Sequence, residues 1–89
     1  MVYTEAVLAP YILRKFTLDI DENELVWHQD EFDRHVLVLE GCNWYLQLDN
    51  QLPLYLAPNR SYFIPCKMYH RLLKGTTDLI ILITEVRDE

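Results

Sequence analysis

The chain has 89 residues, and 14 acidic against 8 basic side chains give it a formal net charge of −6. A chain of this length forms a single domain, and a composition of 51% hydrophobic and 25% charged residues is typical of folded globular proteins. Because its basic residues are few and scattered, we expect neither nucleic acid nor an anionic membrane as a partner, since both require a cationic patch. Residues 1–89 are therefore predicted to form one domain.

The sequence lacks the features of exported and membrane-spanning proteins. It begins without the cationic and apolar segments of a secretory signal, and its longest apolar run, 79–83, is far shorter than the roughly 20 residues that span a bilayer. We therefore predict a cytoplasmic protein. Cys42 and Cys66 are then predicted to be buried thiols rather than a disulfide pair, because disulfides are rare in the cytosol.

Turn-forming residues recur along the chain at 49–50, 58–59, 65 and 75–76, and segments rich in aliphatic and aromatic residues lie between them. This rhythm is typical of short antiparallel strands. The predicted strands are 11–20, 24–28, 35–39, 44–48, 54–56, 61–64, 71–73 and 78–86. We therefore expect an all-β fold, a small sandwich or barrel of about eight strands.

Alternation along the predicted strands separates buried from exposed faces. Trp44, Leu46 and Leu48 share one face of their strand, and polar neighbours occupy the other. Segment 79–83 is apolar on both faces, which predicts either a strand covered on both sides or an edge strand in a subunit contact. Because a homodimer would cover exposed strand edges, we expect this protein to be one.

Two of the three histidines lie near carboxylates in a pattern that suits a metal ion. In an extended backbone, His28 and Asp30 point to the same side, roughly 7 Å apart at their Cα atoms. His70 opens a later predicted strand and is expected to face them from the opposite wall, whereas His35 is expected to face outward. Two imidazoles and one carboxylate form the triad that suits Fe(II), and Mn, Ni, Co or Zn would also bind.

Two alternatives remain open for the carboxylates of this predicted metal site. Aspartate side chains often cap the turn in which they lie, so Asp30 is either a metal ligand or a turn residue. Asp33 is a competing carboxylate if the turn is looser than expected.

The same residues resemble the first motif of the cupin superfamily. That motif runs glycine, five residues, His, one residue, His, three or four residues, Glu, six residues, glycine. His28 and Asp30 fall on the two histidines, Arg34 falls on the glutamate, and Gly41 closes the motif. The pattern His-x-Asp with a distant His is also similar to the triad of the 2-oxoglutarate oxygenases, which share the same core but are much longer.

The second cupin motif is found further along the chain, so that the motif-bearing core covers residues 22–74. Pro65 and His70 match this motif by residue type. Its other defined positions carry different residues, namely Asn59, Lys67 and Lys74. The resemblance implies a double-stranded β-helix, and it implies a metal held by His28, Asp30 and His70, because an arginine at position 34 cannot replace the family's glutamate as a ligand.

The side chains around the predicted metal ligands suggest a second role, the binding of a small anionic molecule. Arg34 either pairs with Asp30 or Asp33 or clamps the carboxylate or phosphate of a ligand. Tyr62 and Tyr69 flank the loop before the last histidine and are predicted to line the mouth of a substrate pocket.

Three functions are compatible with the sequence. The first is a small metallocupin that binds a divalent metal and a small organic anion, with dioxygenase or isomerase chemistry if it is an enzyme. The second is a metal-free, non-catalytic module that binds a small molecule. The third is an interaction domain whose acidic face binds a basic partner. Because the fold alone does not establish a reaction, these alternatives depend on the site.

Overall fold

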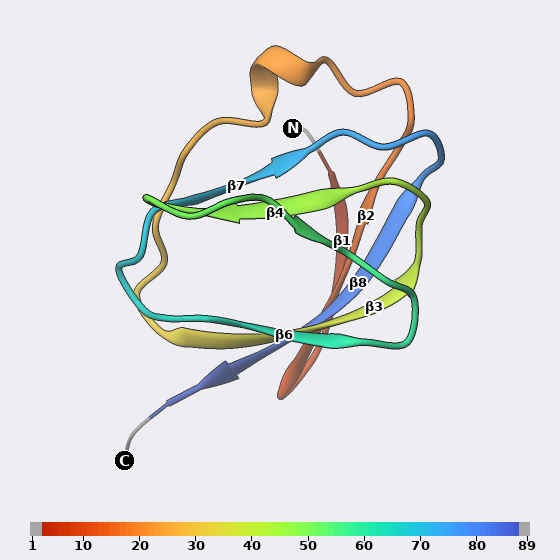
Figure 1. Cartoon of the computed structure of the whole chain (residues 1–89). Coiled ribbons are helices and arrows are strands. Elements are labelled where there is room, and N and C mark those ends of the chain that lie inside the picture. Colours follow the sequence, from red (N-terminus) through yellow and green to blue (C-terminus); the bar gives the residue numbers. More distant parts are fainter. Residues whose placement is uncertain (1–2, 88–89) are drawn as a thin grey trace.

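The computed structural model describes residues 3–87, which contain eight strands and one short 3₁₀ helix (Figure 1). In chain order the elements are β1 (Thr4–Leu8), β2 (Tyr11–Phe16), η1 (Glu22–Glu24), β3 (Asp33–Glu40), β4 (Tyr45–Leu48), β5 (Leu54–Tyr55), β6 (Ser61–Ile64), β7 (His70–Leu73) and β8 (Leu79–Val86). The all-β prediction is confirmed. None of the helical structure among the described residues is long and apolar enough to cross a bilayer.

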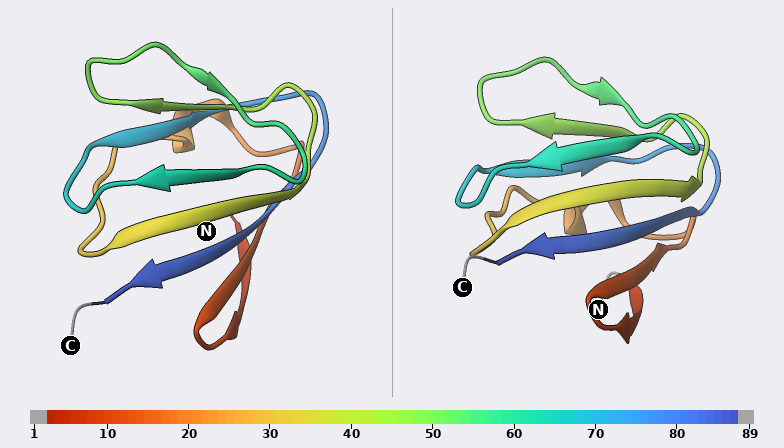
Figure 2. Two further views of the ribbon diagram at one scale, coloured as in Figure 1. Left: turned by 60° about the horizontal axis from the view of Figure 1, so that its bottom comes forward. Right: turned by 90° about the horizontal axis from the view of Figure 1, so that it is seen from below.

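The strands form two antiparallel sheets that face each other. The larger sheet has the order β1-β2-β8-β3-β6 and the smaller one the order β5-β4-β7. Figure 2 shows the two layers from the side, with the β1–β2 hairpin projecting from the larger sheet. The apolar core fills the space between the layers and consists of Phe16, Ile20, Val36, Val38, Trp44, Leu46, Leu48, Leu56, Ile64, Leu79, Ile81 and Ile83.

The predicted alternation of faces is found in the strands that supply this core. Trp44, Leu46 and Leu48 are all buried, and the indole Nε1–H of Trp44 donates a hydrogen bond of 2.7 Å to the carbonyl of Thr77. Strand β8 lies between β2 and β3, so the alternative that placed segment 79–83 at a sheet edge is wrong. Its inner face is buried and its outer face is half-buried, which explains why both faces are apolar.

Three features of the N-terminal part differ from the sequence prediction. Strand β1 was not predicted, because its side chains are all exposed and its sequence lacks the alternation of a half-buried strand. The predicted strand 24–28 does not form, because Asp21 caps helix η1 there and its carboxylate accepts a hydrogen bond of 2.9 Å from the Asn23 N–H. The predicted strand 11–20 ends at Phe16, four residues early, and a turn follows.

The two cysteines are free thiols, as expected, but both are exposed, so their predicted burial is wrong. Cys42 lies between β3 and β4, and Cys66 lies between β6 and β7. Both positions belong to loops at the ends of strands, where side chains point away from the core between the sheets.

Candidate metal centre

Two of the predicted metal ligands are joined directly through their backbones. The His28 N–H donates to the His70 carbonyl at 3.0 Å, and the His70 N–H donates to the His28 carbonyl at 2.9 Å. This bridge ties the loop after η1 to the first residue of β7. The two imidazole rings therefore lie beside each other, with their centroids 4.2 Å apart and their planes at 63°.

The backbone also orients each ring. His28 Nδ1 lies 3.1 Å from the carbonyl oxygen of Val26, and His70 Nδ1 lies 2.9 Å from that of Met68. A neutral imidazole that donates from Nδ1 keeps a free lone pair on Nε2. His28 stands at the exposed rim of the site, but desolvation of its ring lowers its pKa, and this effect outweighs the hydrogen bond to Val26. Both rings are thus oriented as metal ligands require.

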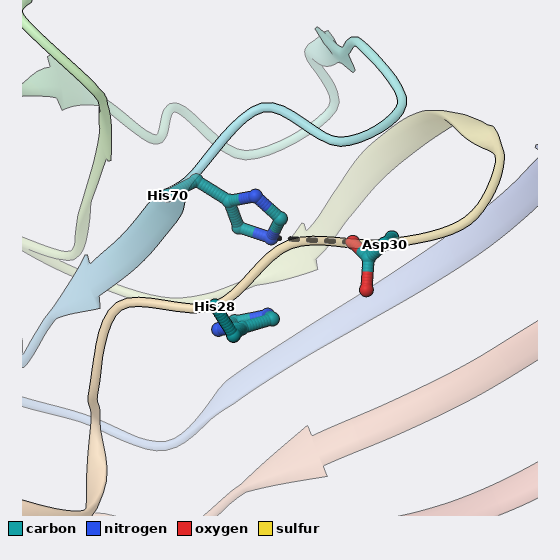
Figure 3. Close-up of side chains that lie close together, drawn as sticks. All are labelled: His28, Asp30 and His70. Carbon is teal, nitrogen blue, oxygen red and sulfur yellow. Dashed lines mark ion pairs between the residues drawn. The ribbon is translucent and has the colours of Figure 1, made fainter.

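Asp30 supplies the carboxylate of the cluster, as Figure 3 shows. Its carbonyl oxygen accepts a hydrogen bond of 2.7 Å from the Lys67 N–H, which fixes the loop of Asp30 against the loop before β7. Burial would raise the pKa of Asp30, but its contact with His70 and the charge of Arg34 outweigh burial and lower it. The carboxylate is therefore charged at neutral pH.

The structure brings the three predicted ligands together. One donor atom from each of His28, Asp30 and His70 lies within 4.8 Å of the other two. Asp30 Oδ2 is buried without a hydrogen bond, but His70 Nε2 and Arg34 Nη1 each lie 3.3 Å away. A buried carboxylate oxygen without a hydrogen bond can bind a cation that displaces the guanidinium. The donor set and its geometry therefore fit a divalent metal ion.

Arg34 lies on the inner face of β3 and belongs to this cluster. Its Nη1 is 3.3 Å from Asp30 Oδ2, and its Nη2 is 3.0 Å from Glu85 Oε2. Asp33, the competing carboxylate, instead accepts a hydrogen bond of 2.7 Å from the Cys66 N–H. Arg34 therefore pairs with Asp30 and not with Asp33, and its alternative role as an anion clamp stays a prediction. A hydrogen bond from Arg87 and the charge of Arg34 outweigh burial and lower the pKa of Glu85.

A cavity opens beside the cluster. Its narrow inner part, about 50 Å³, reaches into the core, and its outer part, about 310 Å³, leads to the surface. Five residues line both parts, namely Arg14, Phe16, His28, Arg34 and Leu72, and each part has further lining residues of its own. The cavity thus connects the candidate metal ligands with solvent.

Arg14 is the residue of this cavity that sequence reasoning missed. It lies on β2, where alternation places it on the same face as Ile12 and the buried Phe16. An arginine at an inward position between two apolar residues was the signal that could have identified it. Such a position is costly for a charge and therefore suggests a partner or a ligand.

The two predicted substrate tyrosines lie outside the lining of this cavity. The Tyr62 hydroxyl accepts a hydrogen bond from the Ala57 N–H and donates one to the Tyr55 carbonyl, both at 2.8 Å. Tyr69 is 49% exposed. Cavity geometry therefore gives no support to a substrate contact at either residue. His35 faces solvent, as predicted, and its ring lies 5.1 Å from that of Phe63.

Comparison with solved structures identifies the fold. An RmlC-like cupin family protein from Methanocaldococcus jannaschii superposes with a TM-score of 0.71 at 12% identity over 96% of this chain and 78% of its own. The enzyme HppE in its iron(II) form gives 0.69 at 18% identity over 94% and 50% of the two chains. A structure described under DMSP lyases RdDddP and RnDddQII gives 0.70 at 20% identity over 82% and 35%.

The present chain thus spans about a third of the lyase structure and half of HppE. No protein-family model and no curated protein matches the sequence. HppE has been solved with cobalt(II) as well as with iron(II). The antiparallel two-sheet barrel and its neighbours agree with the motifs found in the sequence, and the chain therefore has the double-stranded β-helix fold of the cupin superfamily.

Proposed function

We propose that this protein binds a divalent metal ion through His28, Asp30 and His70 and presents it to a small organic anion. The observation that carries the proposal is the convergence of three donor atoms within 4.8 Å around a buried carboxylate oxygen that has no hydrogen-bond partner. His28 and Asp30 line the outer part of the open cavity, and His28 and His70 line its inner part, so a ligand can reach the remaining coordination positions of an ion.

The donor set favours particular metals. Two imidazoles and one carboxylate with open positions suit Fe(II), and they also accept Mn, Co, Ni or Zn. The iron(II) and cobalt(II) forms of HppE, which shares the fold, support this choice of ions. Such an ion supplies Lewis-acid or oxygen-activating chemistry when bound, so dioxygenation or isomerisation of a small organic acid is the reaction class that we propose.

The chain's own residues would prepare the site for this task. The carbonyls of Val26 and Met68 hold the two imidazoles in the tautomer that exposes Nε2. The lowered pKa of Asp30 keeps its carboxylate charged and able to bind a cation. Phe16 and Leu72 form apolar walls of the cavity.

A second candidate function is supported by one contact. Arg34 already pairs with Asp30 at 3.3 Å, so its charge partly neutralises the carboxylate that a metal would use. In this candidate, the protein is a metal-free cupin that binds a small molecule without catalysis. Metal content therefore distinguishes the two functions.

The deciding experiment is elemental analysis of untagged protein purified without chelator and then reconstituted anaerobically with Fe(II) or Co(II). Wild type should hold close to one ion per chain, and His28→Ala and His70→Ala should both lose it. His35→Ala removes an exposed imidazole on the outside of β3 and should keep the ion. Wild-type protein without metal after reconstitution would exclude the metalloprotein and leave the metal-free module.

A further inference from the structure

Arg14 is a cationic residue of the cavity that the proposed metal site leaves unused. It lies opposite Ile81 of the neighbouring strand β8, and its side chain is only 12% exposed. It lines both the inner and the outer part of the cavity. A nearly buried guanidinium in a cavity wall loses much of its hydration, so an anionic partner would stabilise it.

The partners that Arg14 has within the described chain do not satisfy all of its donors. Its Nη2 donates a hydrogen bond of 3.3 Å to Glu5 Oε1. Its guanidinium lies 4.0 Å from the centre of the Tyr3 ring, and its Nε is buried without a hydrogen-bond partner. This guanidinium therefore keeps a donor for a ligand.

Arg34 is less suited to receive an anion. Both of its terminal nitrogens already contact carboxylates, those of Asp30 and Glu85. An anionic group brought to its remaining Nε would approach these two negative charges. Among residues 3–87, Arg14 forms an ion pair only with Glu5. Electrostatic repulsion thus favours Arg14 as the anion-binding residue.

The outer cavity has both apolar and polar walls. Its apolar lining consists of Tyr3, Phe16, Leu25, Val26 and Leu72, and its polar lining of Arg14, Glu24, His28, Asp30 and Arg34. At about 310 Å³ it lies at the lower end of the range for small-molecule sites. Its occupant is therefore a short organic molecule with an apolar middle and polar ends.

We propose that Arg14 binds the carboxylate of a short-chain organic acid whose other end reaches the metal cluster. The second half of this statement rests on the proposed function, whereas the contact with Arg14 does not require a metal. The ligand class is a small acid with an apolar spacer and a metal-coordinating oxygen group. Arg14 is thereby assigned as a residue that determines specificity.

Adipate is a suitable probe because it carries two carboxylates on an apolar spacer. Calorimetric titration of adipate compares wild type, Arg14→Gln and the matched control Lys15→Gln, each with and without cobalt(II). Lys15→Gln removes the same charge from the neighbouring, outward-facing position of β2. We expect Arg14→Gln to weaken adipate binding about tenfold or more, the loss typical of a charge-assisted hydrogen bond, and Lys15→Gln to leave it unchanged.

Equal affinity in wild type and Arg14→Gln, or undetectable binding to wild type, would overturn the assignment. A second measurement does not depend on the fold of the variant. The Arg14 Nε–H signal in the ¹H–¹⁵N spectrum of the wild type is identified by its absence in Arg14→Lys. This signal should shift when adipate is added. A signal that does not move at saturation would also overturn the assignment of Arg14. If wild type binds no cobalt, the metal proposal fails, but the metal-free titrations still test Arg14.

Discussion

Arg34 and His70 contact the same oxygen atom: Arg34 Nη1 and His70 Nε2 each lie 3.3 Å from Asp30 Oδ2. A metal ion that used this oxygen would replace the guanidinium at the cluster. At a few ångströms, two charges near a protein surface interact by about 4 kcal/mol per unit pair, so the positive charge of Arg34 opposes a bound cation appreciably. In the proposed metal site, Arg34 would therefore limit the affinity for a cation.

The first prediction concerns replacement of Arg34. Arg34→Gln removes the competing charge and should tighten cobalt(II) binding about tenfold, equivalent to about 1.4 kcal/mol. Arg34→Glu places a carboxylate where the cupin motif has one and should tighten binding further. Competition titration with a chelator measures both affinities, with the exposed Arg60→Gln as the control of equal charge change. Unchanged affinity in both variants would show that Arg34 does not oppose the metal.

The same replacement should have the opposite effect on the metal-free protein. Without Arg34, the partly buried carboxylates of Asp30 and Glu85 each lose one ion pair, although Asp30 keeps its contact with His70 and Glu85 keeps Arg87. The free energy of unfolding of Arg34→Gln in chelator should therefore fall by roughly 1 to 3 kcal/mol, as when hydrogen bonds to charged groups are lost. Urea unfolding monitored by tryptophan fluorescence provides the measurement. Stability equal to that of wild type would mean that these ion pairs contribute nothing to the apo fold.

The pKa of His28 predicts how the stability of the metal-free protein depends on pH. Desolvation lowers the pKa of His28 below 6.5, so the unfolded chain binds more protons than the folded one between the two values. The stability that neutral His28 contributes is complete above pH 6.5. It is lost as the pH falls through the pKa that His28 has in the folded protein. In chelator, His28→Ala should therefore lose less stability than wild type between about pH 7.5 and about pH 5. Parallel curves for the two proteins would contradict this assignment.

The fold was predictable because residue alternation and motif spacing can be read directly from the sequence. Trp44, Leu46 and Leu48 alternate with polar residues, and the motif positions from His28 to His70 keep the spacing of a cupin. Strand β1 was not predicted because its side chains are all exposed. It is held in place by backbone pairing with β2. A strand held by hydrogen bonds alone leaves no hydrophobic period in the sequence.

The site was predictable only in part. His28 and His70 could be placed together because the cupin motifs assign them to one cavity, and the structure joins them by backbone hydrogen bonds. The partner of Arg34 was left open between Asp30 and Asp33, since one turn of the backbone decides which carboxylate points inward. Arg14 comes from a strand outside both motifs, so only the tertiary packing of β2 brings it to the cavity.

Gly75 is predicted to be irreplaceable for steric reasons. A Cβ atom built at this position would lie 2.1 Å from the Cys42 carbonyl oxygen and 2.4 Å from Trp44 Cδ1. Gly75→Ala should therefore lower the free energy of unfolding by about 1 to 3 kcal/mol or more, the usual cost of overpacking. Thermal unfolding with Lys67→Ala as an exposed loop control tests this. An unchanged melting temperature would mean that the loop shifts freely away from the tryptophan.

The predicted homodimer leads to a last test, on strand β1. This strand forms an edge of the larger sheet, where unpaired N–H and C=O groups can pair with another chain, and it carries the exposed apolar Val7 and Leu8. We expect sedimentation to show a dimer for wild type and a monomer for Val7→Lys, because a charge there would be desolvated by the partner. Leu52→Lys alters a residue that is 85% exposed elsewhere and should remain dimeric. A monomeric wild type would refute the dimer, and a dimeric Val7→Lys would place its interface away from β1.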